Sequence, residues 1–170
     1  MFEFLNQNIQ WIDYKIHFSN YKKALCEALQ KANKSIRMTT YLTAFSFKKA
    51  GNPVNDIMKI IEQKKRKGVE IKFIIDGPKK GAANFKPALF FSKYLEGNGY
   101  KYAIQKGKPT LHMKITIIDL EKIFIGSHNL TRSSIQNPLD CTVQIKSMAL
   151  GVLLADKFDL LFESLKNGKS

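Results

Sequence analysis

The chain has 170 residues, of which 44% are hydrophobic, and its 28 Lys and Arg against 14 Asp and Glu leave a formal net charge of +14. This length and composition are those of one globular domain, so we expect residues 1–170 to form a single domain. Two widely spaced cysteines, Cys26 and Cys141, exclude a CxxC metal site and are expected to be free thiols.

Strands and helices are expected to alternate along the chain. The expected strands cover 13–18, 35–47, 69–75, 100–105 and 141–145, with a hairpin inside 112–129. The expected helices follow Ser19 or Asn20 and then cover 54–67, 87–95 and 155–165, and the stretches 48–53, 79–86, 106–110 and 131–138 are expected loops. This order predicts an α/β fold with a mixed, largely parallel sheet flanked by helices on both faces.

The positive charge is concentrated in one quarter of the chain. Residues 77–118 hold eight lysines against one acid, Glu96. A domain this basic is expected to bind a polyanion, either nucleic acid or an anionic membrane, although a solvated lysine face is the alternative. The candidate substrate-binding lysines lie in two loops: Lys79, Lys80, Lys106 and Lys108.

Aromatic residues beside these loops could stack on bases, with core packing as the alternative, which we expect for Phe90 and Phe91. The N-terminus has no basic region before an apolar run and so predicts no signal peptide. Charged residues between 148 and 165 argue against a membrane span. We therefore expect a soluble, cytoplasmic protein and favour nucleic acid over a membrane as its partner.

Residues 112–129 contain two runs of alternating apolar residues around a short polar break, which predicts a β-hairpin. A turn centred on Leu120 and Glu121 would place His112 opposite Asn129. The same register would place Lys114 opposite Ser127, so that these four polar side chains share one face. An imidazole, an ammonium, a hydroxyl and an amide together are suited to holding a phosphate. A shift of one residue in the register would break this arrangement.

These residues also form a known pattern. His112 and Lys114 begin an HxKxxxxD sequence that ends at Asp119, and after six intervening residues Gly126 begins a GSxN sequence. The pattern resembles the signature of the phospholipase D superfamily, which includes phosphodiesterases, nucleases and phospholipid-processing enzymes. In particular, the chain resembles the small bacterial nucleases that carry a single copy of the signature.

The resemblance implies roles for the residues. His112 would be the nucleophile, Lys114 and Asn129 would hold the phosphate oxygens, and Ser127 would support the site. Asp140 stands where the small nucleases usually have a glutamate that orients the histidine, and aspartate is one methylene shorter.

Other residues of this region are expected to be structural. Asp119 and Gly126 belong to the signature, but we expect them to shape the hairpin. His128 is expected to be packed or exposed rather than catalytic, and His17 to be structural.

The candidate residues favour a reaction without a metal ion. Phosphodiester hydrolysis needs a nucleophile, neutralisation of the non-bridging oxygens and an acid for the leaving oxygen. Metal enzymes supply these functions with carboxylate-bound cations, but this site is cationic and neutral with one nearby carboxylate. We expect no cofactor and no obligatory metal, and a covalent phosphohistidine intermediate.

A single signature implies an isologous homodimer, in which His112 of one chain attacks and that of its partner protonates the leaving oxygen. The leading hypothesis is an endonuclease acting on DNA or RNA. The alternatives are a phospholipid phosphodiesterase or transferase, and a weakly catalytic nucleic-acid-binding module of a larger restriction-type system.

Overall fold

In the computed structural model, which describes residues 13–44, 51–78, 81 and 85–168, a seven-stranded sheet organises the described part of the chain. The strands are β1 (Asp13–His17), β2 (Ser35–Thr40), β3 (Glu70–Asp76), β4 (Lys101–Gln105), β5 (Ile115–Ile118), β6 (Lys122–Gly126) and β7 (Thr142–Lys146). The helices are α1 (Tyr21–Gln30), α2 (Pro53–Arg66), α3 (Phe85–Gly97), α4 (Arg132–Ile135) and α5 (Met148–Lys166).

The strand order is β1-β7-β6-β5-β2-β3-β4. Among the described strands, only β2 with β3 and β3 with β4 pair in parallel, and the other four pairings are antiparallel. The expectation of a mixed sheet is confirmed, but "largely parallel" is wrong. Parallel neighbours need a long crossover, which α2 and α3 supply, whereas β5 and β6 are joined by a short turn and the connection from β6 to β7 contains only the four-residue helix α4.

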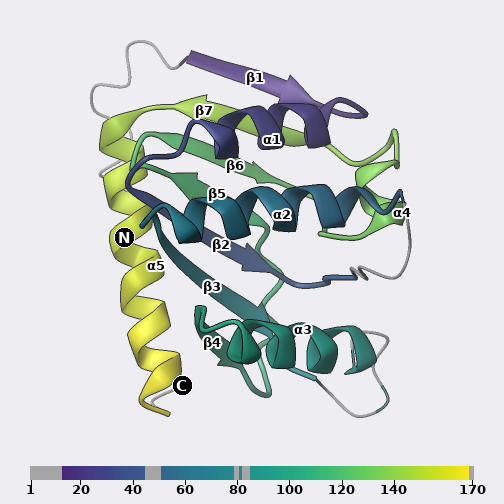
Figure 1. Ribbon diagram of the computed structural model, residues 1–170, viewed down its shortest axis with the longest axis vertical. Helices are drawn as coiled ribbons and strands as arrows, with labels where there is room; N and C mark the ends of the chain where they lie inside the picture. Colours follow the sequence, from purple (N-terminus) through teal and green to yellow (C-terminus); the bar gives the residue numbers. More distant parts are fainter. Residues whose placement is uncertain (1–12, 45–50, 79–80, 82–84, 169–170) are drawn as a thin grey trace.

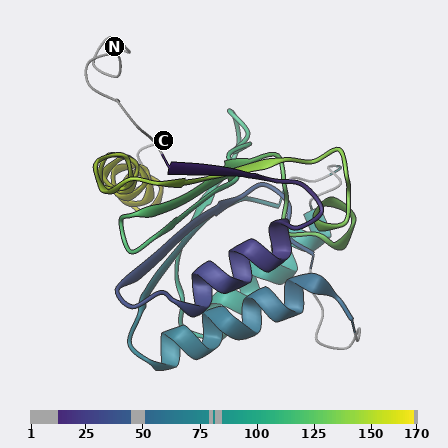
Figure 2. The same cartoon turned by 90° about the horizontal axis from the view of Figure 1, so that it is seen from above.

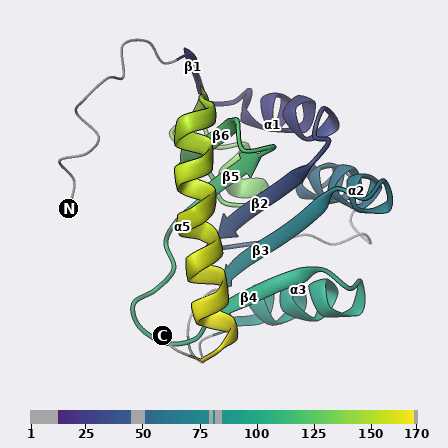
Figure 3. The same cartoon turned by 90° about the vertical axis from the view of Figure 1, so that its left-hand side faces the viewer.

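Helices cover both faces of the sheet, as expected. Helices α1, α2 and α3 lie on one face and α5 crosses the other (Figures 1 and 3), and the view from above separates the same layers (Figure 2). Alternation along β3 serves both layers, because Phe73 and Ile75 join the core under α1–α3 while Ile74 joins the core under α5. Phe91 of α3 is buried as expected, but Phe90 is 53% exposed, which corrects the expectation that it is core.

Helix α5 is longer than expected and begins at Met148 instead of Ala155. Ser147 explains the early start, because its side chain accepts a hydrogen bond from the backbone N–H of Leu150 at 3.2 Å and so caps the helix.

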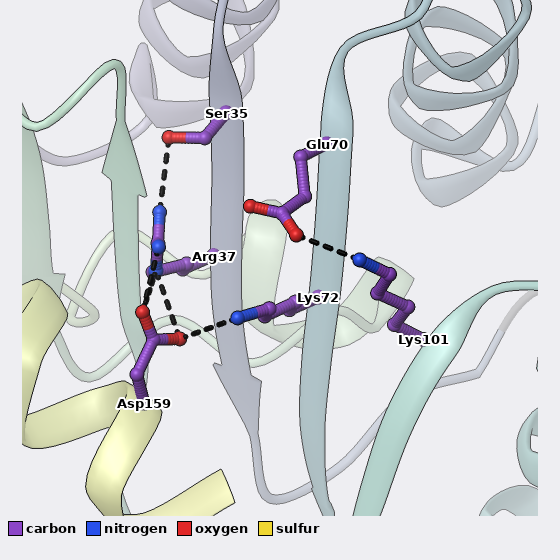
Figure 4. A network of polar contacts seen from close by, with 6 residues as sticks. All are labelled: Ser35, Arg37, Glu70, Lys72, Lys101 and Asp159. Atoms are coloured by element: carbon purple, nitrogen blue, oxygen red, sulfur yellow. Dashed lines mark hydrogen bonds and ion pairs between the residues drawn. The ribbon is translucent and has the colours of Figure 1, made fainter.

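A partly buried ionic network fixes α5 to the sheet (Figure 4). Asp159 of α5 accepts hydrogen bonds from Arg37 of β2 at 2.7 Å and from Lys72 of β3 at 3.0 Å. Hydrogen bonds to these two cations hold the pKa of Asp159 below its usual range, although burial opposes this by favouring the protonated form. The ammonium of Lys72 also lies 5.5 Å from the Phe162 ring centre.

The hairpin exists, but the expected register is wrong by one residue. Ile115 is paired with Ile125 and Ile118 with Lys122, and the backbone N–H of Gly126 donates to the carbonyl of Lys114 at 3.3 Å. Lys114 therefore faces Gly126 and not Ser127.

The turn explains the shift. Asp119 and Leu120 have φ values of 54° and 59°, so the tightest part of the turn begins at Asp119 rather than Leu120. The Asp119 carboxylate fixes this conformation by accepting hydrogen bonds from the backbone N–H groups of Asn33, Lys34 and Ser35 at 2.7 to 2.9 Å.

Candidate active site

The first half of the motif lies just before β5. Thr39 accepts a hydrogen bond from the backbone N–H of Ile115 at 2.9 Å, which attaches this segment to the end of β2. The exposed His112 ring lies 5.0 Å from the ring of Tyr41, and the Lys114 ammonium lies 5.2 Å from the same ring. Lys114 also donates to the carbonyl of His112 at 2.7 Å. The imidazole and the ammonium are therefore neighbours despite the changed register.

The second half of the motif follows β6 and contacts the same segment after β2. The backbone N–H of Leu42 donates to Oδ1 of Asn129 at 3.3 Å, and that of Ala44 donates to the carbonyl of Leu130 at 2.8 Å. Residues 41–44, which we call the β2 extension, thus lie against both halves of the motif. Nδ2 of Asn129 bonds to none of the described residues, so it remains a donor for a phosphate oxygen.

Asp140 organises hydroxyl groups instead of the His112 imidazole. Its carboxylate accepts hydrogen bonds from Ser127 at 2.7 Å and Ser134 at 2.6 Å. Ser134 in turn accepts from the backbone N–H of Asn129 at 2.8 Å. Within the described residues Asp140 makes no hydrogen bond to His112, so the histidine-orienting contact that the family pattern assigns to a glutamate at this position has no counterpart here. Instead, Asp140 supports Ser127 directly and Asn129 through Ser134.

Burial and hydrogen bonds move the pKa values of Lys114 and Asp140 below their ordinary values. Burial lowers the pKa of Lys114, and the nearby Asp140 carboxylate raises it only in part. For Asp140 itself, burial raises the pKa, but hydrogen bonds from Ser134 and Ser127 outweigh that effect and the net pKa is below the ordinary value. The site thus holds an ionised carboxylate near an ammonium whose proton is held less firmly than usual.

Gly126 and His128 form the inner side of the second half. A Cβ on Gly126 would collide with the carbonyl of Cys141 and with Thr142, so this motif position has no room for a side chain. The Thr142 hydroxyl that occupies the space is 2.8 Å from Nδ1 of His128, whose ring stacks on Tyr21 at 4.3 Å. His128 is packed, in agreement with the expectation, and its burial turns the neighbouring residues Ser127 and Asn129 toward the surface.

The candidate lysines fall in different places. Lys106 and Lys108 are exposed in the loop after β4, and Lys108 lines a hollow of about 390 Å³ together with His112. Lys79 and Lys80 lie outside the described residues. Asp119 lies at the far end of the hairpin from His112, where its carboxylate bonds only to backbone groups among the described residues.

Sequence reasoning missed the β2 extension and Ser134. Ligands of open α/β sheets bind at the carboxyl ends of strands where the connections diverge, and β2 has its parallel neighbour on one side and its antiparallel neighbour on the other. This rule points to the segment directly after β2, and Tyr41 is its first residue. No local signal marks Ser134, because its role depends on the path of the chain to Asp140.

The part of the chain that the structure describes contains no group of three His, Cys, Asp or Glu side chains placed to hold a metal ion. It also contains no helix that is long and apolar enough to cross a membrane.

Residues 25–165 match the family described as "Cardiolipin synthase, PLD-like domain". The chain belongs to this phospholipase D-like family. Membership assigns the PLD-like protein to enzymes that act on phosphodiester bonds, in agreement with the resemblance carried by the motif. No curated protein matches the sequence.

Solved structures share the fold. The phospholipase D family member Nuc from Salmonella typhimurium is 23% identical with a TM-score of 0.68, over 92% of this chain and 95% of Nuc. NucT from Helicobacter pylori is 17% identical with a TM-score of 0.72, over 91% of this chain and 98% of NucT. TrmBL2, an archaeal chromatin protein, is 18% identical with a TM-score of 0.54, over 95% of this chain and 56% of TrmBL2.

Proposed function

We propose that this PLD-like protein is a metal-independent endonuclease that hydrolyses DNA or RNA through a covalent phosphohistidine. The observation that carries the proposal is the β2 extension, which lies against both His112 with Lys114 and Asn129. A nucleophile, a cation and an amide donor around one surface position are the groups that phosphoryl transfer requires.

The reaction proceeds in two displacements. A ring nitrogen of His112 bonds to phosphorus while the bond from phosphorus to the leaving oxygen breaks, and that oxygen takes a proton from an acid. Lys114 and Asn129 bind the non-bridging oxygens as negative charge develops. Water then attacks phosphorus, gives a proton to the group that acted as the acid, and releases His112.

The acid comes from a second copy of the chain. The sequence has three histidines, and His17 and His128 are only 5% and 2% exposed. His112 is therefore the one histidine free to reach substrate, and an isologous homodimer would bring two of them to one phosphate.

An apolar face near the site supports this homodimer. Tyr14 and Ile16 of β1 are 62% and 52% exposed, and they are paired with Ile145 and Val143 on β7. Ile145 packs with the core under α5, so this apolar strip lies on the α5 face of the sheet. Met113, next to His112 and 39% exposed, lines a hollow with α5 on the same face. A second copy covering this face would bury apolar area up to the edge of the site.

Nucleic acid is favoured as the substrate by charge. The net charge of +14 and the exposed Lys106 and Lys108 beside His112 suit a polyanion with repeated phosphates. TrmBL2, which shares the fold, is described as binding DNA. That similarity also supports the alternative of a weakly catalytic DNA-binding module of a larger restriction-type system.

One observation favours a phospholipid phosphodiesterase or transferase as the second candidate. The hollow of about 390 Å³ beside His112 shares Met113 and Leu161 with a second hollow of about 210 Å³. Apolar side chains line much of both hollows, which suits an acyl chain better than a base. The description of the matching family also names cardiolipin synthase.

Plasmid nicking in excess EDTA tests the leading proposal. Wild type should cleave, and His112→Ala should lose at least about 10³-fold in rate while keeping the wild-type melting temperature. Salt-sensitive DNA binding without cleavage would favour the binding module, and headgroup release from phospholipid vesicles with DNA left intact would favour the lipid enzyme.

The homodimer has its own test. Ile16→Asp should convert dimer to monomer in sedimentation and reduce cleavage in parallel. Phe90→Asp, which changes an exposed apolar residue on the opposite face, should do neither. A strictly monomeric wild type that still cleaves would refute the shared-histidine mechanism.

A further inference from the structure

Tyr41 is the side chain that contacts both reactive groups of the first motif half. Its ring lies 5.0 Å from the His112 ring with the two planes tilted by 54°. The ammonium of Lys114 lies 5.2 Å from the centre of the same ring. The next residue, Leu42, donates its backbone N–H to Asn129. One short segment therefore contacts the three groups expected to bind the scissile phosphate.

The surroundings of Lys114 explain why the aromatic face matters. Lys114 is half-buried, and among the described residues no carboxylate forms an ion pair with it. The groups that face its ammonium are the carbonyl of His112, the ring of Tyr41 and, at longer range, the carboxylate of Asp140. Burial disfavours the charged ammonium, and the negative face of an aromatic ring stabilises a nearby cation without neutralising it.

The backbone on both sides of Tyr41 is anchored by contacts that do not involve the side chains of His112 and Lys114. Thr39 lies two residues earlier and is bonded to Ile115, while Thr43 forms a bridge with Leu130. The backbone on both sides of Tyr41 is therefore fixed to elements that carry the motif.

We propose that Tyr41 is a positioning residue whose ring face keeps the Lys114 ammonium charged and sets the orientation of the His112 imidazole. An ion pair would bring Lys114 to the same place but would oppose its binding of phosphate. The ring leaves the positive charge available to the substrate. Both contacts are made by the ring, so the hydroxyl of Tyr41 is dispensable.

The inference rests on the proposed function for its kinetic part, and a ring-free variant tests it. Tyr41→Leu should lower kcat by about 10- to 100-fold with a smaller change in KM, since misplaced reactive groups cost rate more than binding. Tyr41→Phe should stay within about threefold of wild type. Tyr102→Leu is the matched control. The ammonium of Lys166 lies 5.7 Å from the centre of the Tyr102 ring, outside the motif, so this variant also removes a contact between a lysine and an aromatic ring.

A titration separates this inference from the proposed function. In side-chain NMR of the Lys114 ammonium, assigned with Lys114→Arg, Tyr41→Leu should lower the pKa of Lys114 by about half a pH unit. Tyr41→Phe and Tyr102→Leu should leave that pKa unchanged. This measurement needs no cleavage, so an inactive wild type would end the nuclease proposal while the inference is still decided.

Three outcomes would overturn the inference: an unchanged Lys114 titration in Tyr41→Leu, a kcat loss no greater than in Tyr102→Leu, or a Tyr41→Phe variant as impaired as Tyr41→Leu. If Tyr41→Leu does not fold, Tyr41→Met replaces it, because methionine fills a similar space without a ring and is expected to give the same two results.

Discussion

The sheet holds cations in two regions under opposite conditions. Beneath α5, Arg37 and Lys72 share the carboxylate of Asp159 (Figure 4), so both cations are paired with a protein carboxylate. At the motif edge, Lys114 lies near Asp140, but that carboxylate is bonded to the hydroxyls of Ser127 and Ser134. Aspartate and basic residues therefore form a structural ion pair in one region, whereas in the other the lysine has no ion pair among the described residues.

The two regions differ in the donors that bind the carboxylate of Asp159 and that of Asp140. Both aspartates have a lowered pKa, by two cations at Asp159 and by hydroxyl donors at Asp140. Hydroxyl groups satisfy a carboxylate without using the positive charge of the site. A phosphate can then approach Lys114 without first displacing a salt bridge, which would cost binding energy.

The largest expected effect comes from removing one cation from each region. Lys114→Met should reduce kcat of cleavage by about 10²- to 10³-fold, since one donor to the transition-state oxygens is lost, with little change in melting temperature. Lys72→Met should leave kcat unchanged and lower the melting temperature. Equal kinetic losses in the two variants would remove the distinction between the regions.

A smaller effect is expected when the structural carboxylate is neutralised. Asp159→Asn should lower the free energy of unfolding by about 2 kcal/mol, because Arg37 is left partly buried without its counter-charge. Urea unfolding would measure this loss. The folded-state pKa of Asp159 is below the ordinary 3.8, so its contribution is complete at pH 7 and is lost as the pH falls through the folded value. The difference in free energy of unfolding between variant and wild type should therefore become smaller only at acidic pH.

The smallest effect is expected in the pH profile of cleavage. Because burial lowers the pKa of Lys114 from 10.5, activity should fall with rising pH before an ordinary lysine would lose its proton. The Asp140 carboxylate raises that pKa, so Asp140→Asn should move the alkaline limb to lower pH by a fraction of a pH unit. Asp156→Asn on the exposed side of α5 serves as the control. A limb that moves upward in Asp140→Asn would contradict this account of the site.

Local patterns predicted most of the elements and the candidate residues. The alternation around residue 119 located the hairpin, and the spacing of HxK and GSxN located the chemistry. The register could not be obtained in this way, because it depends on hydrogen bonds from residues 33–35 to Asp119, more than eighty positions away. The extent of antiparallel pairing beyond the hairpin was underestimated for a related reason, since alternating helices and strands describe only the crossovers through α2 and α3.

The role of Asp140 was also beyond local reasoning. A carboxylate before a strand suggested a contact with His112, but the side chain it meets depends on how the turn containing α4 folds back. Ser134 lies on that turn and captures one carboxylate oxygen. Tyr41 was overlooked because no motif letter marks it, although its place at the end of a central strand is a physical reason to consider it.

The three backbone hydrogen bonds to the Asp119 carboxylate have a practical consequence for transplanting this signature to another scaffold. A copied hairpin that lacks three converging backbone amides at its tip would be free to slide by one position, and a slide of one position inverts every side chain of the ribbon. The Lys114 ammonium would then point to the opposite face of the hairpin, although the motif sequence would be unchanged. A recipient scaffold should therefore be chosen first for a loop that can bind the aspartate, and only then for its suitability for the histidine.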